Sequence, residues 1–413
     1  MNKNTLRYKI IKWWVCSKLP DVHILKYYNN KTSLLGFFKF FLLHPLKRRF
    51  AKYYLLFLKR TSKVKVIAIT GSSGKTTTKE MLTSVLKLDG SVVSTYKNID
   101  PIYNIPETIL RTKINTKYLI LEMGVEYPDE MDFYLWLAKP DISIITNINP
   151  THLEFFKNID GVFKEKIKIF SDNKNSILFF NNDDNYLKGK LKIIPESMVG
   201  YGKGTNIYAS NIHKSNMNSI FTLNIDKSKI SVQLPVYGIP FISNSLVAAA
   251  VSNYLGINLK IIKQGLENYE LPEHRMNIFK ESNGAIIVDD TYNNNPKAAE
   301  ETLKSVKQLA NGKKVGIVIG DMLELGSESI KFHKQLGKLI GQMSPVFLIY
   351  IGDFSNNVIN EALRCDKNIK TYTAKTTKEA YQLLLKHLNR DKIILVKGSR
   401  SLALDEIIDK LSK

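Results

Sequence analysis

The sequence predicts an α/β protein with two α/β domains, and three observations carry that prediction. Short β-branched runs alternate with helical stretches after residue 63, as in a mostly parallel sheet covered by helices. A glycine-rich loop at residues 71–74 joins an apolar run to a helical one, as in a P-loop ATPase-like domain. The first 62 residues are basic and aromatic, unlike the rest of the chain, and we expect a short helical segment there.

Apolar runs and turn residues give the order of the elements. The expected strands are residues 64–70, 118–122, 142–146, 285–288, 315–319, 346–351 and 393–396. Between about residues 193 and 234, alternating Asn- and Ser-rich segments predict an antiparallel excursion, and a helix of small residues follows at 244–253. A polar stretch then ends at Arg275. We therefore expect a segment 1–62, a central domain 63–272 and a C-terminal Rossmann-like domain 273–413.

The positive charge is concentrated at the N-terminal end. Residues 1–65 contain twelve Lys and four Arg but one acidic residue, Asp21, and so carry +15, whereas the other 348 residues share the remaining +7 of the total +22. A nucleic-acid-binding ATPase would spread basic residues around its core, so we expect no nucleic acid partner. The two cysteines, Cys16 and Cys365, have no metal or disulfide spacing and fit a reducing, cytoplasmic interior.

The N-terminal segment is also rich in large apolar side chains, such as Trp13, Trp14 and the run 34–43. No run reaches the roughly 18 apolar residues that span a bilayer, because Lys39 interrupts the longest one. Aromatic residues interleaved with Lys and Arg favour helices that lie on an anionic membrane surface. Packing onto the rest of the protein and nucleic-acid binding are the alternatives that the sequence leaves open.

The loop Gly71-Ser72-Ser73-Gly74-Lys75-Thr76-Thr77 has the features of a phosphate-binding loop. Its glycines let backbone N–H groups approach an anion, and the following helix N-terminus favours negative charge. Lys75 is expected on the β- and γ-phosphates of ATP, and the Thr76 hydroxyl on Mg²⁺. The loop is shorter than the strict Walker pattern, because Ile69 stands where that pattern has its first glycine.

Three downstream residues add candidate catalytic groups. Glu122 ends an expected strand and could hold a metal, His152 lies in a loop after another strand, and Lys166 lies on an expected helix. Each has a simpler interpretation alone: a solvated acid, a satisfied loop histidine and a surface lysine. Their occurrence together after a phosphate loop favours the functional interpretation.

With these motifs the chain resembles the Mur ligases, ATP-dependent amide-forming enzymes of cell-wall precursor synthesis, over about residues 64–410. Gly71 to Thr77 resembles the phosphate loop of the family, Glu122-Met-Gly its metal-binding acid and His152-Leu-Glu its metal-binding histidine. Lys166 stands where the family carries a carbamylated lysine. Three C-terminal segments resemble the branch that adds D-alanyl-D-alanine: residues 289–296 (DDTYNNNP), 320–326 (GDMLELG) and 397–401 (KGSRS).

The resemblance implies a mechanism and a set of site residues. A carboxylate of a muramyl-peptide precursor would attack the γ-phosphorus of ATP, and the amine of D-alanyl-D-alanine would then attack the acyl phosphate. Lys75, Glu122, His152 and Lys166 would be catalytic, with one Mg²⁺ on Thr76 and Glu122 and a second on His152 and the carbamate of Lys166. The other implied residues are Asn244, Arg275, Asp290, Tyr292 and Asn293 for the nucleotide, and Asn98, Lys397, Ser399 and Arg400 for the substrates.

The chain departs from the resemblance at residues 238–241 and 98–104, and residues 1–62 are too few for the usual N-terminal domain that binds the uridine nucleotide. We therefore expect an acceptor held differently or presented on a lipid at the inner face of the membrane, and a monomeric enzyme. A ligase of the same superfamily with a different acceptor, such as one that adds glutamate to a folate, is the alternative enzyme. A non-catalytic relative is disfavoured, because all five of Lys75, Thr76, Glu122, His152 and Lys166 are present.

Overall fold

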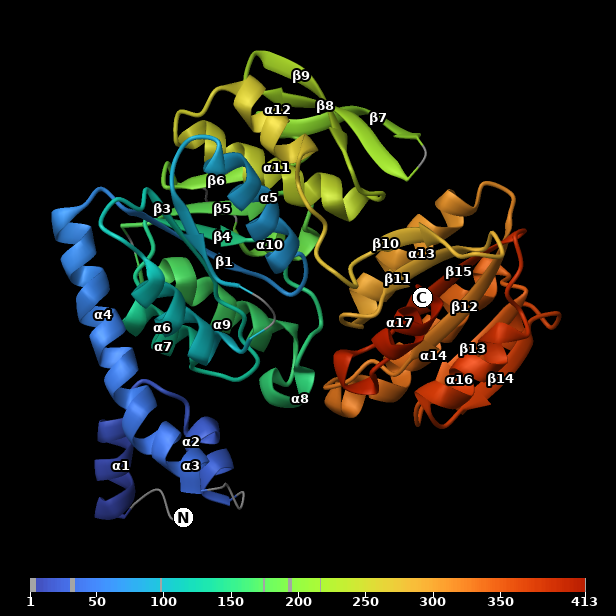
Figure 1. The fold of residues 1–413 in the computed structure, drawn as a ribbon, viewed down its shortest axis with the longest axis horizontal. Helices are drawn as coiled ribbons and strands as arrows, with labels where there is room; N and C mark the ends of the chain where they lie inside the picture. Colours follow the sequence, from blue (N-terminus) through green and yellow to red (C-terminus); the bar gives the residue numbers. More distant parts are fainter. Residues whose placement is uncertain are drawn as a thin grey trace.

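The computed structural model describes residues 5–29, 34–96, 99–173, 175–191, 195–215 and 217–412. Within these ranges the strands form two six-stranded sheets and one three-stranded sheet. The N-terminal helices lie at one end of the central sheet, and the C-terminal sheet lies on its other side (Figure 1). This arrangement confirms the expected α/β fold class.

The N-terminal segment is helical, as predicted. Its elements are α1 (Leu6–Cys16), α2 (Asp21–Asn29), α3 (Leu34–Phe38), the π-helix η1 (Lys39–Leu43) and α4 (His44–Thr61). Helix α4 packs on the central domain through Ala51, Leu55 and Leu58, which are buried. Ion pairs from Lys47 to Glu107 (2.9 Å) and from Lys59 to Asp141 (2.8 Å) flank this contact. Among the described residues, none of the helices is long and apolar enough to cross a bilayer.

The central sheet has the order β2-β3-β1-β4-β5-β6, and every pair in it is parallel. Its strands are β1 (Lys65–Thr70), β2 (Val92–Ser94), β3 (Tyr118–Glu122), β4 (Ile142–Ile145), β5 (Ile177–Asn181) and β6 (Met198–Tyr201). The accompanying helices are α5 (Lys75–Lys87), α6 (Pro101–Arg111), α7 (Glu130–Leu137), α8 (Leu153–Phe156), α9 (Ile159–Ser171) and α10 (Asn185–Lys190).

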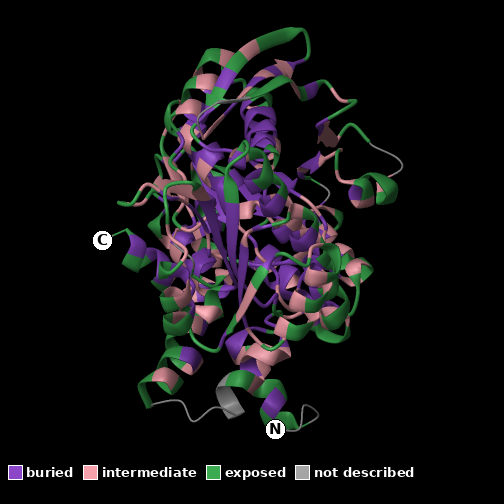
Figure 2. Ribbon diagram, turned by 90° about the vertical axis from the view of Figure 1, so that its right-hand side faces the viewer, coloured by how far each residue is buried: buried purple, intermediate pink, exposed green. Residues whose placement is uncertain are grey.

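Alternate residues of β1 bury their side chains in two different cores. Ile67 and Ile69 pack with α5, α11 (Ile239–Tyr254) and α12 (Leu259–Glu267), whereas Val66 and Ala68 pack with α4, α6, α7 and α9. The sheet therefore lies between two helical layers, and Figure 2 shows its buried strands at the centre.

The expected antiparallel excursion at residues 193–234 was correct only in part. Strands β7 (Ile207–Ser215), β8 (Asn218–Ile225) and β9 (Ser228–Leu234) form an antiparallel sheet, but β6 pairs parallel with β5 in the central sheet. Four residues are too few to display a period of two, so the pattern of β6 could not be separated from that of its neighbours.

The C-terminal sheet has the order β10-β11-β15-β12-β13-β14, in which β10 is antiparallel to β11 and the other pairs are parallel. Its strands are β10 (Asn277–Lys280), β11 (Ile286–Asp290), β12 (Lys314–Gly320), β13 (Phe347–Ile351), β14 (Lys370–Ala374) and β15 (Lys392–Lys397). Its helices are α13 (Pro296–Ala310), η2 (Gly326–Glu328), α14 (Ser329–Met343), α15 (Ser355–Cys365), α16 (Thr377–Leu385), η3 (Arg400–Leu402) and α17 (Asp405–Leu411).

Candidate active site

The loop between β1 and α5 has the backbone that its glycines predict. Gly71 has φ 145°, and a Cβ on it would lie 1.9 Å from Thr146 Oγ1. Gly74 has φ 79° and precedes the first helical residue, Lys75. The first N–H groups of α5 and its positive helix end therefore face the region beyond the loop, where an anion can bind.

A polar segment that follows β4 holds this loop in place. Ser73 donates its N–H to Asn147 Oδ1 (2.9 Å), and Thr146 Oγ1 donates to Ser73 O (2.6 Å). Ser72 Oγ donates to Asn149 O (2.9 Å). No role was predicted from the sequence for Asn147 or Asn149. Their position directly after a strand parallel to β1 was the available signal, because the carboxyl ends of neighbouring parallel strands meet at one edge.

Thr76 lies at the meeting point of three segments. Its hydroxyl donates to the Glu122 carboxylate, whose two oxygens are each 3.0 Å away, and accepts from Arg275 Nη2 at 3.0 Å. Glu122 ends β3, and Arg275 lies between α12 and β10. The Arg275 guanidinium also lies over the Tyr292 ring, 3.9 Å from its centroid. Arg275 therefore joins the phosphate loop to the C-terminal domain.

Lys75 is half-buried among groups of both charges. Its Nζ donates to Gly71 O at 2.9 Å. Burial lowers the pKa of Lys75, the nearby Glu122 carboxylate opposes that shift, and Arg275 adds to it. A bound phosphate would supply the negative charge that stabilises this ammonium group.

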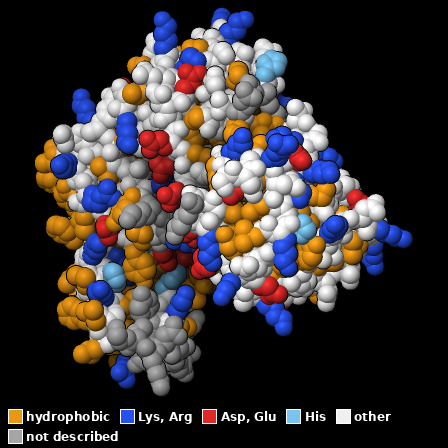
Figure 3. Space-filling view, turned by 45° about the vertical axis from the view of Figure 1, so that its right-hand side comes forward, with side chains coloured by type: hydrophobic (Ala, Val, Ile, Leu, Met, Phe, Trp, Pro, Cys, Tyr) orange, Lys and Arg blue, Asp and Glu red, His pale blue; other side chains and the backbone are white. Residues whose placement is uncertain are grey.

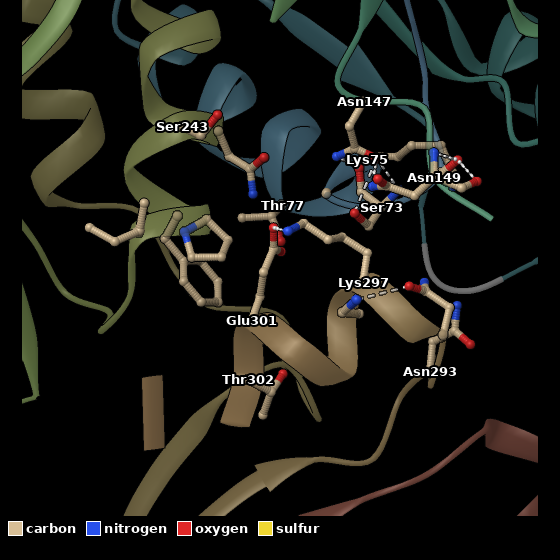
Figure 4. Close-up of a pocket in the computed structure, with 18 of the residues that line it drawn as sticks. Ser73, Lys75, Thr77, Asn147, Asn149, Ser243, Asn293, Lys297, Glu301 and Thr302 are labelled. Carbon is tan, nitrogen blue, oxygen red and sulfur yellow. Dashed lines mark hydrogen bonds and ion pairs between the residues drawn. The ribbon is translucent and has the colours of Figure 1, made fainter. Parts of the chain in front are cut away.

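A cavity of about 810 Å³ lies between the carboxyl ends of the two large sheets. From the loop it is lined by residues 72–77, and from the C-terminal domain by Asp290, Tyr292, Asn293 and Lys397. Figure 4 shows Ser73, Lys75, Asn147 and Asn149 on one side of it and Lys297, Glu301 and Thr302 of α13 on another. The α13 residues were not predicted from the sequence, although the lining residues Lys297, Glu301, Lys304 and Gln308 recur every three or four positions, which places them on one helical face.

Lys397 connects two of the predicted nucleotide residues of the C-terminal domain, Asp290 and Asn293. Lys397 is 1% exposed, and its Nζ donates to Asp290 Oδ2 (2.6 Å) and Asn293 O (2.8 Å). Ser399 Oγ donates to Asp321 O (3.0 Å). Arg400 is exposed in η3 and does not line the cavity, and neither does Ser399.

Asn244 and Asn98, both predicted as binding residues, have different outcomes. Asn244 lines the cavity and lies against Gly74, where an added Cβ would be 2.6 Å from Asn244 Oδ1. Asn98 lies outside the described residues, so its predicted contact with a substrate stays a prediction.

His152 and Lys166 do not line the cavity. His152 has φ 53° and precedes α8, and its Nδ1 is 2.5 Å from Glu324 Oε2 of the C-terminal domain. The backbone N–H of Glu154 also donates to Glu324 O (3.2 Å). This contact between the domains was missed, because nothing in the local sequence marks residues 172 positions apart as neighbours.

Lys166 is 1% exposed in α9. Burial, with Lys75 close by, holds the pKa of Lys166 well below the usual value for lysine. A neutral amine is the form that reacts with carbon dioxide, so the environment of Lys166 is compatible with the carbamate that the resemblance implies.

The oxygen ligands at the loop fit Mg²⁺. Among the residues that the structure describes, no three His, Cys, Asp or Glu side chains are grouped to hold a metal ion. The Thr76 hydroxyl and Glu122 carboxylate would supply two oxygens, which suits an ion that takes its other ligands from water and phosphates.

Comparisons with known proteins agree with this geometry. Residues 69–252 match the Mur ligase middle domain, and residues 274–400 match the Mur ligase, glutamate ligase domain. The chain is 35% identical over 354 residues to the UDP-N-acetylmuramoyl-tripeptide–D-alanyl-D-alanine ligase of Buchnera aphidicola subsp. Baizongia pistaciae, covering 84% of this chain and 75% of the relative. It is 30% identical over 361 residues to the ligase of that name from Escherichia coli K12, covering 84% and 77%.

Solved structures give the same result. A crystal structure of MurF from Acinetobacter baumannii matches with a TM-score of 0.79 and 27% identity, covering 89% of this chain and 80% of that one. The MurF ligase from Thermotoga maritima, in complex with ADP, matches with a TM-score of 0.77 and 26% identity, covering 89% and 83%. With its phosphate loop, interdomain cavity and matched domains, the chain belongs to the Mur ligase family of ATP-dependent ligases.

Proposed function

We propose that this Mur ligase joins D-alanyl-D-alanine to a muramyl-tripeptide cell-wall precursor in an ATP-dependent reaction. The observation that carries the proposal is the cavity in which Lys75, Thr76 and Glu122 of the central domain face Arg275 and Asp290 from the C-terminal side. The names of the relatives from Buchnera aphidicola and Escherichia coli support the choice of substrates.

In the first half-reaction, the acceptor carboxylate attacks the γ-phosphorus of ATP, which forms an acyl phosphate and releases ADP. Both reactants are anions, so the site must first reduce their repulsion. The N–H groups of residues 74–76 and the Lys75 ammonium would stabilise the phosphates, and Arg275 can reach them from the linker by leaving Thr76.

Mg²⁺ held by Thr76 and Glu122 would neutralise phosphate charge and polarise the transferred phosphoryl group. A second Mg²⁺ would be held by His152 and a carbamate on Lys166. The burial of Lys166, which lowers the pKa of its amine well below the usual value for lysine, supports the carbamate. Nuclear magnetic resonance with ¹³C-labelled bicarbonate would detect that carbamate, and a Lys166→Arg variant would lack its signal.

In the second half-reaction, the amine of the dipeptide attacks the acyl carbon and phosphate leaves. We place the dipeptide near Asn98, Lys397, Ser399 and Arg400. Lys397 is held by Asp290 and Asn293, so it would position the segment, while the exposed Arg400 is free to contact the dipeptide carboxylate. Contact between the domains at Glu324 would limit the access of water to the acyl phosphate.

We also propose that the enzyme works as a monomer in the cytoplasm, associated with the inner face of the membrane through residues 1–62. The basic, aromatic composition of that segment supports this location, and the modest charge of the remaining residues argues against nucleic acid as a partner.

The test is ATP-dependent phosphate release by the full chain with D-alanyl-D-alanine and a muramyl-tripeptide acceptor. The acceptor is supplied as the uridine nucleotide in one arm and in a lipid-linked form in the other. We expect phosphate and peptide product with at least one acceptor, and neither with a Lys75→Met variant of unchanged melting temperature. ATP binding without product from either acceptor would overturn the proposed substrates.

A further inference from the structure

Helix α4 has two apolar faces, and the central domain covers one of them. The inner face contributes Ala51, Leu55 and Leu58 to the core. The outer face presents Leu46, Phe50, Tyr53 and Phe57, spaced by three or four residues, and Phe50 and Tyr53 are each 66% exposed. A soluble helix normally places polar residues on its outer face, so this stripe indicates a partner.

The neighbouring N-terminal helices also expose large apolar side chains. Fourteen of the twenty-four exposed large apolar side chains in the described part of the chain lie between residues 6 and 57. We call the following set the outer face: Leu6, Ile10, Trp13, Leu34, Leu35, Phe37, Phe38, Leu42, Leu43, Leu46, Phe50, Tyr53, Leu56 and Phe57. Figure 3 shows hydrophobic side chains interspersed with Lys and Arg along the left edge, the side on which α4 lies in Figure 1.

The charges around the outer face identify the chemistry of the partner. Lys39, in η1, and Arg60, near the end of α4, are exposed and flank the stripe in the sequence. The one acidic residue of this segment, Asp21, pairs with Lys12 at 2.6 Å. A second copy of the chain would bring two strongly basic segments together. Nucleic acid would use the cations but would leave the leucines in water.

We propose that the outer face docks on an anionic lipid bilayer. Its leucine and aromatic side chains would enter the boundary between headgroups and acyl chains, while Lys and Arg contact the negatively charged headgroups. The inference deepens the proposed membrane location of residues 1–62 and rests on it.

A chain of contacts joins the N-terminal segment to the region of His152. His23 of α2 bonds through Nε2 to Glu130 Oε1 (2.7 Å), and its ring meets Tyr127 edge-on. Tyr127 packs on Phe155, 4.3 Å between ring centroids, three residues from His152. Docking would therefore hold the region of His152 near the bilayer, where a lipid-linked acceptor is concentrated.

The test is co-sedimentation of the full chain with vesicles of phosphatidylcholine alone and of phosphatidylcholine mixed with phosphatidylglycerol. We expect binding to the mixed vesicles only, weakened by salt. A triple variant, Phe50→Ser with Tyr53→Ser and Phe57→Ser, should bind at least ~10-fold more weakly. The matched control, Tyr254→Ser with Ile330→Ser and Leu385→Ser, removes exposed apolar side chains elsewhere and should bind normally.

Several outcomes would overturn the inference. These are equal binding to both vesicle types, no binding to either, and unchanged binding by the triple variant. A dimer in light scattering that is absent in the triple variant would also overturn it. The melting temperature and the phosphate release of the triple variant with the uridine-nucleotide acceptor should match those of the parent, which excludes misfolding. Vesicle binding without ligase activity would reject the proposed function and leave the docking surface intact.

Discussion

Replacing Gly74 by alanine tests two reasons for a glycine in the phosphate loop. One is the positive φ of its backbone, and the other is the lack of space for a Cβ beside Asn244. Gly74 has φ 79° and Gly256 has φ 82°, so alanine meets the same backbone strain at both positions. A Cβ at Gly256 would have no heavy atom within 4 Å, whereas a Cβ at Gly74 would lie 2.6 Å from Asn244 Oδ1 and 3.2 Å from its Cγ. Comparing Gly74→Ala with Gly256→Ala therefore separates the cost of backbone strain from the cost of crowding against Asn244.

The expected costs follow from these contacts. Alanine in the left-handed region costs about 1–2 kcal/mol, so we expect that loss of unfolding free energy for Gly256→Ala. Crowding against the buried Asn244 adds about 1–3 kcal/mol, so Gly74→Ala should lose roughly 2–5 kcal/mol. Because Asn244 and the first turn of α5 border the cavity, ATP affinity should fall about tenfold in Gly74→Ala and stay unchanged in Gly256→Ala.

Urea denaturation and calorimetric titration with ATP measure both effects. In the double variant Gly74→Ala with Asn244→Ala, the crowding disappears, so the two changes should couple by about 1–3 kcal/mol in a double-mutant cycle. Equal losses for Gly74→Ala and Gly256→Ala, or strict additivity with Asn244→Ala, would refute the reasoning.

Three further predictions concern charged groups at the site. Arg275→Lys should lower kcat/KM about 10- to 100-fold, because lysine cannot keep a planar contact with Tyr292 and a bond to Thr76 together. Glu324→Gln should weaken the contact with His152 and raise amide hydrogen exchange at residues 152–156, measured by mass spectrometry. Burial, with Glu324 and Glu130 close by, raises the pKa of Glu126 from 4.5 to about 7 in the folded protein. Between these two pH values the folded protein therefore holds a proton that the unfolded chain has released. Stability should therefore fall as pH rises between these values, and Glu126→Gln should be more stable than the parent by about 1 kcal/mol at about pH 8 but not at about pH 4, measured by urea denaturation.

Each of these predictions has its own control. For Arg275, a Tyr292→Leu variant should show an effect that is not additive with Arg275→Lys, and additive losses would contradict the shared contact. For Glu324, the control is Glu328→Gln, which removes a pair with Lys331 inside one domain and should leave exchange at residues 152–156 unchanged. For Glu126, a difference from the parent that is the same at both pH values would rule out the assigned shift.

Much of the fold could be predicted from the sequence because its signals are local. The buried runs that became β1, β3 and β4 are long, apolar and bounded by turns, and the helix after Gly74 begins directly at Lys75. The phosphate loop was recognisable for the same reason, since the strand, glycines, Lys75 and Thr76 follow one another without interruption.

The remaining features depend on contacts between residues that are far apart in the sequence, and local sequence patterns do not reveal such contacts. The contact of His152 with Glu324 and the facing of α13 toward the loop arise only when two domains meet. The strand β6 joins the edge of the central sheet in parallel, although the sequence around it predicts antiparallel strands. The aromatic and basic residues of α4 were visible in the sequence, but which of them face solvent depended on the packing of α4 against α6 and α7.

The bond from Arg275 to Thr76 has a kinetic consequence. The Arg275 guanidinium contacts the hydroxyl that a divalent cation would use, and two cations at one oxygen repel each other. Loading of the metal-bound nucleotide and release of the linker arginine must then occur together. Substitutions in the linker at residues 268–274 should consequently change the association rate of ATP.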